Sequence, residues 1–321
     1  MTALEQVRRT IKFEHPTRFT RNLPDPYGTD FAWTGMDPNP DYRPPSGTDE
    51  WGAVWGNIGV SNLGEVKDFP LKDWVQWDSL KIPDITDPRR WKSLEGARER
   101  AGDRFLLASG ISIYERAHFL RGLENLWCDI HENPEELCRL LDVLTDMNVY
   151  AIERYREAGV DGYFFCDDWG LQDRLMIDPK HFRQFWKPRY ARIFQAARKA
   201  GMCTLLHSCG YTLDVLGDWI EAGLDVIQYD QQENMGLQTL GERFRGKVTF
   251  LCPVDIQKTM VNGTLDDIRA YARAMFGAFR TPAGGFIPTW YSDPTGAGHR
   301  QEAIRAMCEE FVRVGGLETG D

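Results

Sequence analysis

REAGVDGYFF (156–165), RKAGMCTLLH (198–207) and IEAGLDVIQY (220–229) are three versions of one pattern, and this pattern decides the fold. In each, the end of a helix is followed by Ala-Gly and then by an apolar run typical of a buried strand. The glycine can adopt the left-handed conformation that ends a helix and turns the chain into a sheet. Three such units in succession predict parallel strands joined by crossover helices.

Two α/β architectures share this local pattern, the closed (β/α)8 TIM barrel and the doubly wound open sheet. We expect strands at 105–110, 162–168, 204–210, 225–230, 248–255 and 284–290. None of them is followed by Gly-x-Gly-x-x-Gly, the phosphate-binding turn of doubly wound domains. The sequence therefore favours the barrel, and 321 residues is an ordinary length for a single one.

The first hundred residues lack this regularity. MTALEQVRRTIKFEH (1–15) predicts a short amphipathic helix, but LPDPYGTDFAWTGMDPNPDYRPPSGTDEWG (23–52) is dense in turn-forming residues. We expect one domain over 1–321, with an irregular cap and the first barrel elements in 1–100 and regular βα units in 101–321. Residues 20–75 are predicted to fold as a cap into the C-terminal mouth of the barrel.

Composition limits the partners of the chain. A net charge of −10 and a pI near 5.2 argue against nucleic acid, because phosphates require basic patches. A small or partly cationic ligand, or a protein partner, fits better, and a homo-oligomer is left open. We expect no membrane association, since there is no run of about 18 apolar residues and no secretory signal. The seven cysteines indicate reduced thiols and a cytoplasmic location.

Polar residues gather where the predicted strands end, which is where barrel enzymes place their catalytic groups. Glu115 and Arg116 follow one strand, and Asp167 and Asp168 follow the next. Because Asp167 and Asp168 are adjacent, they face opposite ways on an extended strand, so that one reaches the mouth and the other caps a helix or forms an ion pair. We predict acid/base roles for Asp167, Asp168 and Glu115, and substrate binding by Arg116. A surface ion pair or a helix start is the alternative for Glu115 and Arg116.

Aromatic residues near the strand ends suit a flat or apolar substrate. We predict that the substrate contacts Trp169, Tyr229, Trp290 and Tyr291.

His207 and Cys209 are two residues apart on a predicted strand, so their side chains share a face. Imidazole and thiolate suit zinc, and a catalytic zinc needs three protein ligands and one open position. Cys252 and Cys166 lie at other strand ends and are candidates for the third ligand. The alternative is that the cysteines fill the core and that His207 is a hydrogen-bonded core residue.

The runs DDWGLQDRLMIDPKHFRQFWKPRYARIF (167–194), HSCG (207–210) and GKVTFLCPVDIQ (246–257) resemble the uroporphyrinogen decarboxylase superfamily. The resemblance extends from Asp103 to Val314 and is most specific in D-P-x-x-F-x-x-F-x-x-P-x-Y. It implies a single (β/α)8 barrel. The superfamily has two branches: decarboxylases of the haem pathway, which need no cofactor, and cobalamin-dependent methyltransferases, which use zinc and pass a methyl group between a corrinoid protein and a thiol or another acceptor.

The chain is more similar to the methyltransferase branch. The decarboxylases carry an MRQAGR signature that binds propionate carboxylates, whereas this chain reads TRFTRNLPDPYG at 17–28. His207 and Cys209 match the His-x-Cys of the methyltransferases, whose third zinc-binding cysteine follows the last strand. GGFIPTWYSDPTGAGH (284–299) has no cysteine there. The resemblance then implies Cys252 as the replacement, or a metal-free protein if neither Cys252 nor an acidic residue completes the site.

Three hypotheses follow. The first is a corrinoid-linked methyltransferase that moves a methyl group between a small molecule or thiol and a cobalamin cofactor, which a partner corrinoid protein carries. The second is a cofactor-free decarboxylase or lyase of a small acid, with Arg116 as the carboxylate anchor beside Asp167. The third is a non-catalytic barrel that docks a corrinoid protein, against which a deep pocket with converging polar groups would argue.

Overall fold

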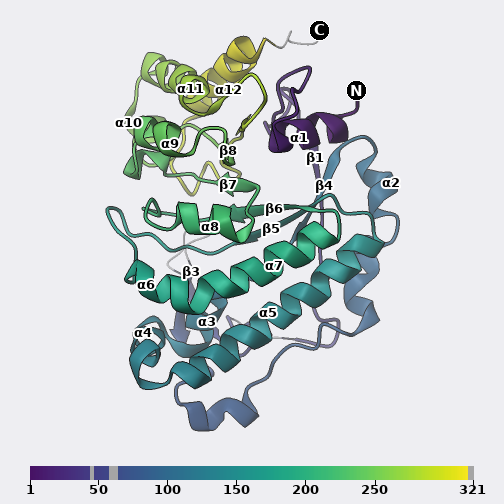
Figure 1. The fold of residues 1–321 in the computed structure, drawn as a ribbon, viewed down its shortest axis with the longest axis vertical. Coiled ribbons are helices and arrows are strands. Elements are labelled where there is room, and N and C mark those ends of the chain that lie inside the picture. Colours follow the sequence, from purple (N-terminus) through teal and green to yellow (C-terminus); the bar gives the residue numbers. More distant parts are fainter. Residues whose placement is uncertain (44–46, 58–63, 317–321) are drawn as a thin grey trace.

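The computed structural model describes residues 1–43, 47–57 and 64–316 (Figure 1). Its main sheet has seven strands, each parallel to its neighbours, and their spatial order follows the chain. They are β1 (Phe31–Thr34), β4 (Phe105–Ser109), β5 (Gly162–Cys166), β6 (Cys203–His207), β7 (Val226–Gln228), β8 (Thr249–Cys252) and β9 (Phe286–Pro288). Such a sheet winds in one direction only, as a barrel does and a doubly wound sheet does not.

An irregular segment around Asn22 takes the eighth place in the wall. The backbone N–H of Asn22 donates to the carbonyl of Pro288 at 3.0 Å, and a parallel bridge joins Asn22 to Thr289. On its other side Asn22 bridges Thr29, which leads into β1. The predicted α/β barrel is confirmed, with seven regular strands and one irregular wall segment.

Helices cover the outside of the sheet, as Figure 1 shows for α5, α7 and α8. The predicted helix at 134–159 is α5, and the one beginning at Pro179 is interrupted by a π-helical turn at Phe182–Trp186. The α-helices are α1 (Ala3–Lys12), α2 (Ala97–Ala101), α3 (Tyr114–Arg121), α4 (Leu123–Glu132), α5 (Pro134–Glu157), α6 (Pro179–His181), α7 (Lys187–Lys199), α8 (Leu216–Ala222), α9 (Leu237–Phe244), α10 (Thr259–Asn262), α11 (Leu265–Phe279) and α12 (Gln301–Gly315). No helix in the described ranges combines the length and apolarity needed to cross a bilayer.

Alternation along the strands decides which side chains enter the barrel. Cys203 and Leu205 of β6 belong to an interior apolar cluster, whereas Leu206 packs with the helices outside. The other strands contribute to the same interior cluster, with Phe31, Phe105, Leu107, Phe164, Val226, Leu251 and Ile287. The parity of a residue number on each strand therefore predicts whether its side chain can reach the mouth.

Helix α1 closes the N-terminal end of the barrel. Its Val7 and Ile11 pack on the interior cluster with 0% and 2% exposure. The carbonyl of Thr10 accepts from the N–H of Gly285, just before β9, and from the hydroxyl of Thr249 at the start of β8. The opposite, C-terminal ends of the strands are left to form the mouth.

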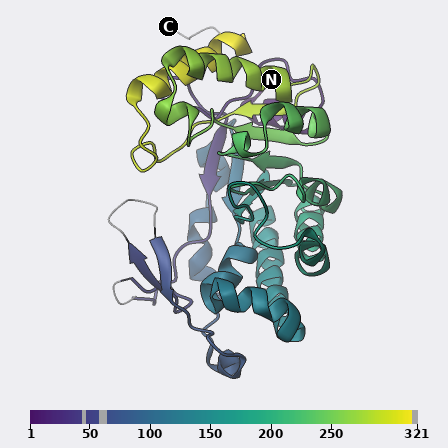
Figure 2. The ribbon, with the colours of Figure 1, turned by 90° about the vertical axis from the view of Figure 1, so that its left-hand side faces the viewer.

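The expected cap over 20–75 needs correction. Residues 22 and 31–34 form part of the barrel wall and not a cap. The sequence did not predict this, because the short strand at 31–34 lies among turn-forming residues. Farther along, the hairpin of β2 (Val54–Asn57) and β3 (Gly64–Asp68) stands beside the barrel, in dark blue in Figure 2. Trp51 packs in the same apolar cluster as the barrel helices. A single domain over 1–321 remains a prediction.

We predict that Ile11→Ala lowers the free energy of unfolding by about 2–4 kcal/mol, because it opens a cavity between α1 and the interior cluster. Denaturant unfolding followed by circular dichroism measures this loss. Arg9→Ala, on the exposed face of the same helix, is the control and should change stability by no more than about 0.5 kcal/mol. Equal effects of the two substitutions would show that α1 does not close the barrel.

Candidate metal centre at the barrel mouth

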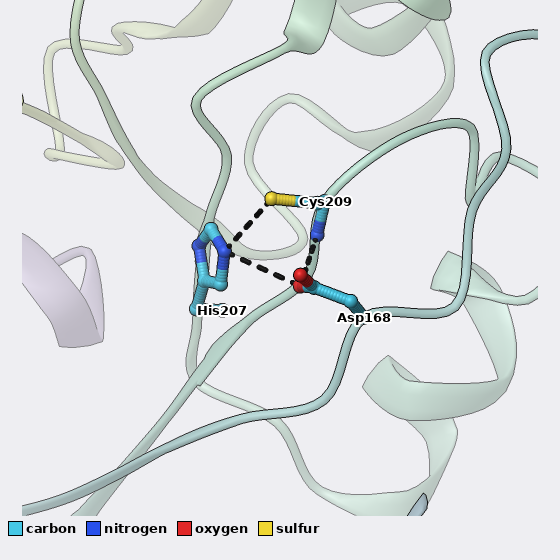
Figure 3. Close-up of side chains that lie close together, drawn as sticks. All are labelled: Asp168, His207 and Cys209. Carbon is cyan, nitrogen blue, oxygen red and sulfur yellow. Dashed lines mark hydrogen bonds and ion pairs between the residues drawn. The ribbon is translucent and has the colours of Figure 1, made fainter. Parts of the chain in front are cut away.

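Three side chains that can bind a metal meet at the ends of β5 and β6: Asp168, His207 and Cys209. Nε2 of His207 lies 3.2 Å from Sγ of Cys209 and 3.4 Å from Oδ1 of Asp168. One ligand atom from each lies within 4.8 Å of the others, and Figure 3 shows the three side chains converging. Tetrahedral zinc, with bonds of about 2.0–2.3 Å, requires ligand atoms roughly 3–4 Å apart.

The strand register brings this cluster together. His207 has the same parity as the interior residues Cys203 and Leu205, so its ring points into the mouth. Beyond the strand, the N–H of Cys209 donates to Oδ1 of Asp168 at 2.7 Å. The N–H of Gly170 donates to the carbonyl of Cys209 at 3.1 Å. These two hydrogen bonds fasten the loop that carries Asp168 to the loop that carries Cys209.

A glutamine sets the orientation of the His207 ring. Nε2–H of Gln228 donates to Oδ1 of Asp230 at 2.7 Å, which turns the amide oxygen of Gln228 toward Nδ1 of His207. Nδ1 is then the protonated donor, and Nε2 is left to face Asp168 and Cys209. A partner of this kind on the other ring nitrogen is typical of metal-binding histidines.

Asp168 and His207 each stabilise the charged form of the other. Burial acts to lower the pKa of His207, but hydrogen bonds and charges from Asp168 and Cys209 outweigh it and hold that pKa well above its ordinary value. Burial likewise opposes ionisation of Asp168, yet its contacts with His207 and Cys209 lower its pKa. Burial raises the pKa of the Cys209 thiol. Without a metal, Nε2 of His207 is therefore protonated, and a metal ion must displace this proton in order to bind there.

Cys252 does not join this cluster, so the prediction that it is the third ligand is wrong. It is fully buried, and it packs with the outer apolar cluster while its neighbour Leu251 faces the barrel interior. Asp168 occupies the third position instead. Cys166 has the inward parity, and burial raises the pKa of its thiol to about 12, but it too lies outside the group of ligands.

Asp167 has a structural role at the start of α3, and its predicted acid/base role stays a prediction. Its buried carboxylate accepts hydrogen bonds from the N–H groups of Ile113, Tyr114 and Glu115 at 2.9–3.0 Å and from the Tyr190 hydroxyl at 2.7 Å. Burial raises the pKa of Asp167 to about 7, against the effect of these hydrogen bonds. Asp167 thus fixes the start of α3, the helix that carries Glu115.

Glu115 and Arg116 have different surroundings. Burial, and then the charges of Asp168 and Asp167, raise the pKa of Glu115 to about 8, which favours the neutral acid. Arg116 donates to Oδ2 of Asp49 at 2.7 Å and lies over the ring of Trp51. Its charge already joins the N-terminal region to α3, and its predicted role as a substrate anchor stays a prediction.

Two of the four predicted substrate aromatics belong to the core. Trp169 is fully buried, stacks on Tyr114 at 3.9 Å, and donates its indole N–H to the Tyr190 hydroxyl. Tyr229 is buried, and its hydroxyl lies 2.7 Å from that of Thr212. Both residues have the outward parity of their strands, which is why neither reaches the mouth.

A cavity of about 390 Å³ adjoins the cluster. It meets the cluster at Gln228 and Asp230, and the predicted Trp290 and Tyr291 line it. The full lining is Asn22, Trp33, Phe164, Gln228, Asp230, Leu251, Thr289, Trp290, Tyr291 and Ser292. Of the described residues in the expected cap, Asn22 and Trp33 line this cavity, and none from 35 to 75 does. The sequence reasoning missed Trp33 and Gln228, although the inward parity of β1 and β7 points to both.

Comparison with known proteins identifies the family of the chain. A family model described as "Uroporphyrinogen decarboxylase (URO-D)" matches residues 66–288. The chain belongs to this family. The family predicted from the sequence motifs is confirmed.

Similar proteins come from both branches of the superfamily. The chain is 31% identical over 101 residues to a uroporphyrinogen decarboxylase of Nocardia farcinica, covering 32% of this chain and 27% of the relative. It is 22% identical over 220 residues to the methylcobamide:CoM methyltransferase MtbA of Methanosarcina mazei, covering 68% and 60%. A solved methyltransferase from Methanosarcina mazei superposes with a TM-score of 0.73 at 16% identity, over 98% of this chain and 99% of the other. This superposition shows that the two share the whole fold.

We predict that Gly170→Ala weakens metal binding on the order of 10-fold, the usual scale for changes around the ligands. A Cβ at Gly170 would lie 2.2 Å from the backbone N of Tyr211 and would push apart the loops that carry Asp168 and Cys209. Competition with a chromogenic zinc chelator measures the affinity. Gly277→Ala is the control, because a Cβ there meets no atom within 4 Å. Unchanged zinc affinity in Gly170→Ala would contradict the role given to this contact.

Proposed function

We propose that this chain is a corrinoid-linked methyltransferase, which moves a methyl group between a small molecule and a corrinoid carried by a partner protein. The convergence of Asp168, His207 and Cys209 at the mouth carries this proposal. Similarity to MtbA, whose name states a methylcobamide substrate, supports the corrinoid as the other partner. The proposed metal is zinc.

The residues present fit zinc. One nitrogen, one sulfur and one carboxylate oxygen are ligands that zinc accepts, and three protein ligands leave a fourth position for a substrate. The orientation of Gln228 already turns Nε2 of His207 toward Asp168 and Cys209, where a metal that displaces its proton would bind. Zinc bound here would lower the pKa of a thiol or hydroxyl at the open position, so that it reacts as an anion near neutral pH.

The surrounding residues have roles of their own. Gln228 and Asp230 hold the His207 ring, and Asp167 holds the backbone of Glu115. Glu115, whose raised pKa favours its neutral form, can donate a proton to a heteroatom that gains charge near Asp168. The cavity beside the cluster holds the part of the substrate that does not react.

The two other hypotheses lack this support. A cofactor-free decarboxylase built on Asp167 and Arg116 would need both groups free, whereas Asp167 is bound to α3 and Arg116 to Asp49. A non-catalytic docking barrel would not need a cavity of about 390 Å³ beside three converging polar groups.

We predict that Cys209→Ala loses both the bound metal and methyl transfer, because it removes the only sulfur among the three proposed ligands. Cys252→Ala is the matched control and should retain both, since Cys252 lies in the outer cluster. Metal content by mass spectrometry of protein loaded with zinc and desalted, together with methyl exchange from methylcobalamin to a panel of thiols, measures the two effects.

Full activity of Cys209→Ala would refute the zinc-dependent mechanism. Loss of metal in Cys252→Ala, with its fold intact by circular dichroism, would restore Cys252 as a ligand and displace Asp168.

A further inference from the structure

The cavity beside the proposed metal centre has an unusual charge balance. Its lining contains one carboxylate, Asp230, and no lysine or arginine among the described residues. Asp230 is 6% exposed and lies beneath the cavity, where its Oδ1 accepts from Gln228 and its Oδ2 lies 3.9 Å from Nδ1 of His207. A substrate that carries a carboxylate or sulfonate would meet this group with no lysine or arginine in the described lining to offset the repulsion.

Arg116 and Arg18 cannot supply such a cation, because both are engaged elsewhere. Arg116 pairs with Asp49 at 2.7 Å and is covered by Trp51. Arg18, which lies in the segment before β1, pairs with Asp30. Neither lines the cavity.

Aromatic rings form the rest of the wall. Trp33 is 52% exposed although it points toward the mouth, and its ring meets that of Phe164 at 5.4 Å and 88°, so that the two rings stand at right angles. Trp290 and Tyr291, which follow β9, also line the cavity. Electron-rich ring faces beside a buried carboxylate attract organic cations, including methylated ammonium groups.

We propose that this cavity binds a cationic group of the substrate, an ammonium or methylated amine, held by Asp230 and the aromatic wall. The proposal rests on the proposed function for the reacting end of the substrate, which the Asp168, His207 and Cys209 cluster would take. It adds to that function the chemical class of the part of the substrate that does not react. It predicts weak binding of substrates whose non-reacting part carries a carboxylate or sulfonate.

Three probes of nearly the same shape test the charge. Choline carries a quaternary nitrogen, 3,3-dimethylbutan-1-ol replaces that nitrogen with carbon, and 3,3-dimethylbutanoate carries a negative charge. We expect choline to bind at least about ten times more tightly than the alcohol, and the carboxylate to bind more weakly than either. Calorimetric titration of the zinc-loaded full chain at low ionic strength measures the three dissociation constants.

Two variants locate the binding. Asp230→Asn should weaken choline about tenfold and leave the alcohol nearly unchanged, and Trp33→Leu should weaken both. Asp173→Asn, an exposed pair with Arg174 outside the cavity lining, is the control and should change neither. Trp33 is half-exposed, so its substitution spares the fold even if that of buried Asp230 does not.

Equal affinities for the three probes, or tightest binding of the carboxylate, would overturn the proposal. So would choline binding that survives in a folded Asp230→Asn variant. Because binding is measured without turnover, choline selectivity in a chain that shows no methyl transfer would refute the proposed function and leave this inference standing. Methyl transfer to an anionic thiol without choline binding would support the proposed function and refute this inference.

Discussion

The hydrogen bond from Nδ1 of His207 to the amide oxygen of Gln228 is the interaction on which the proposed site depends. Asp230 fixes it, because it accepts from the other end of the same amide and so prevents Gln228 from turning over. With Nδ1 occupied, Nε2 can face only Asp168 and Cys209. A rotated glutamine would offer His207 a donor instead, and the ring would lose the tautomer that a metal needs.

The barrel supplies the rigidity behind this interaction. His207 and Gln228 are direct neighbours in the register of β6 and β7, and Asp168 follows β5 on the other side of β6. Closure through Asn22 and the packing of α1 hold these strands at fixed spacing. Cys209 lies in a loop, where no strand fixes the position of its backbone. The close approach of Gly170 and Gly210 fixes that position instead.

Much of the fold and half of the site follow from the sequence. The Ala-Gly repeats predict β5, β6 and β7 with the helices before them, and apolar runs predict β4, β8 and β9. The His-x-Cys spacing predicts the pair His207 and Cys209. The sequence could not say which face of each strand is interior, because a strand buried on both faces shows no alternation of polarity. The outward placement of Asp167, Trp169, Tyr229 and Cys252 was unreadable for this one reason, since all four have the outward parity. The pairing of Arg116 was unreadable because its partner, Asp49, lies in a stretch with no visible regularity.

The central claim is that one sulfur, one nitrogen and one carboxylate oxygen of this chain bind zinc at the barrel mouth. X-ray absorption spectroscopy at the zinc edge tests it most directly, because scattering from sulfur is readily separated from that of nitrogen and oxygen. The account predicts a single sulfur neighbour at about 2.3 Å, with the remaining neighbours nitrogen or oxygen at about 2.0–2.2 Å. A zinc with two sulfur neighbours, or with none, would contradict it.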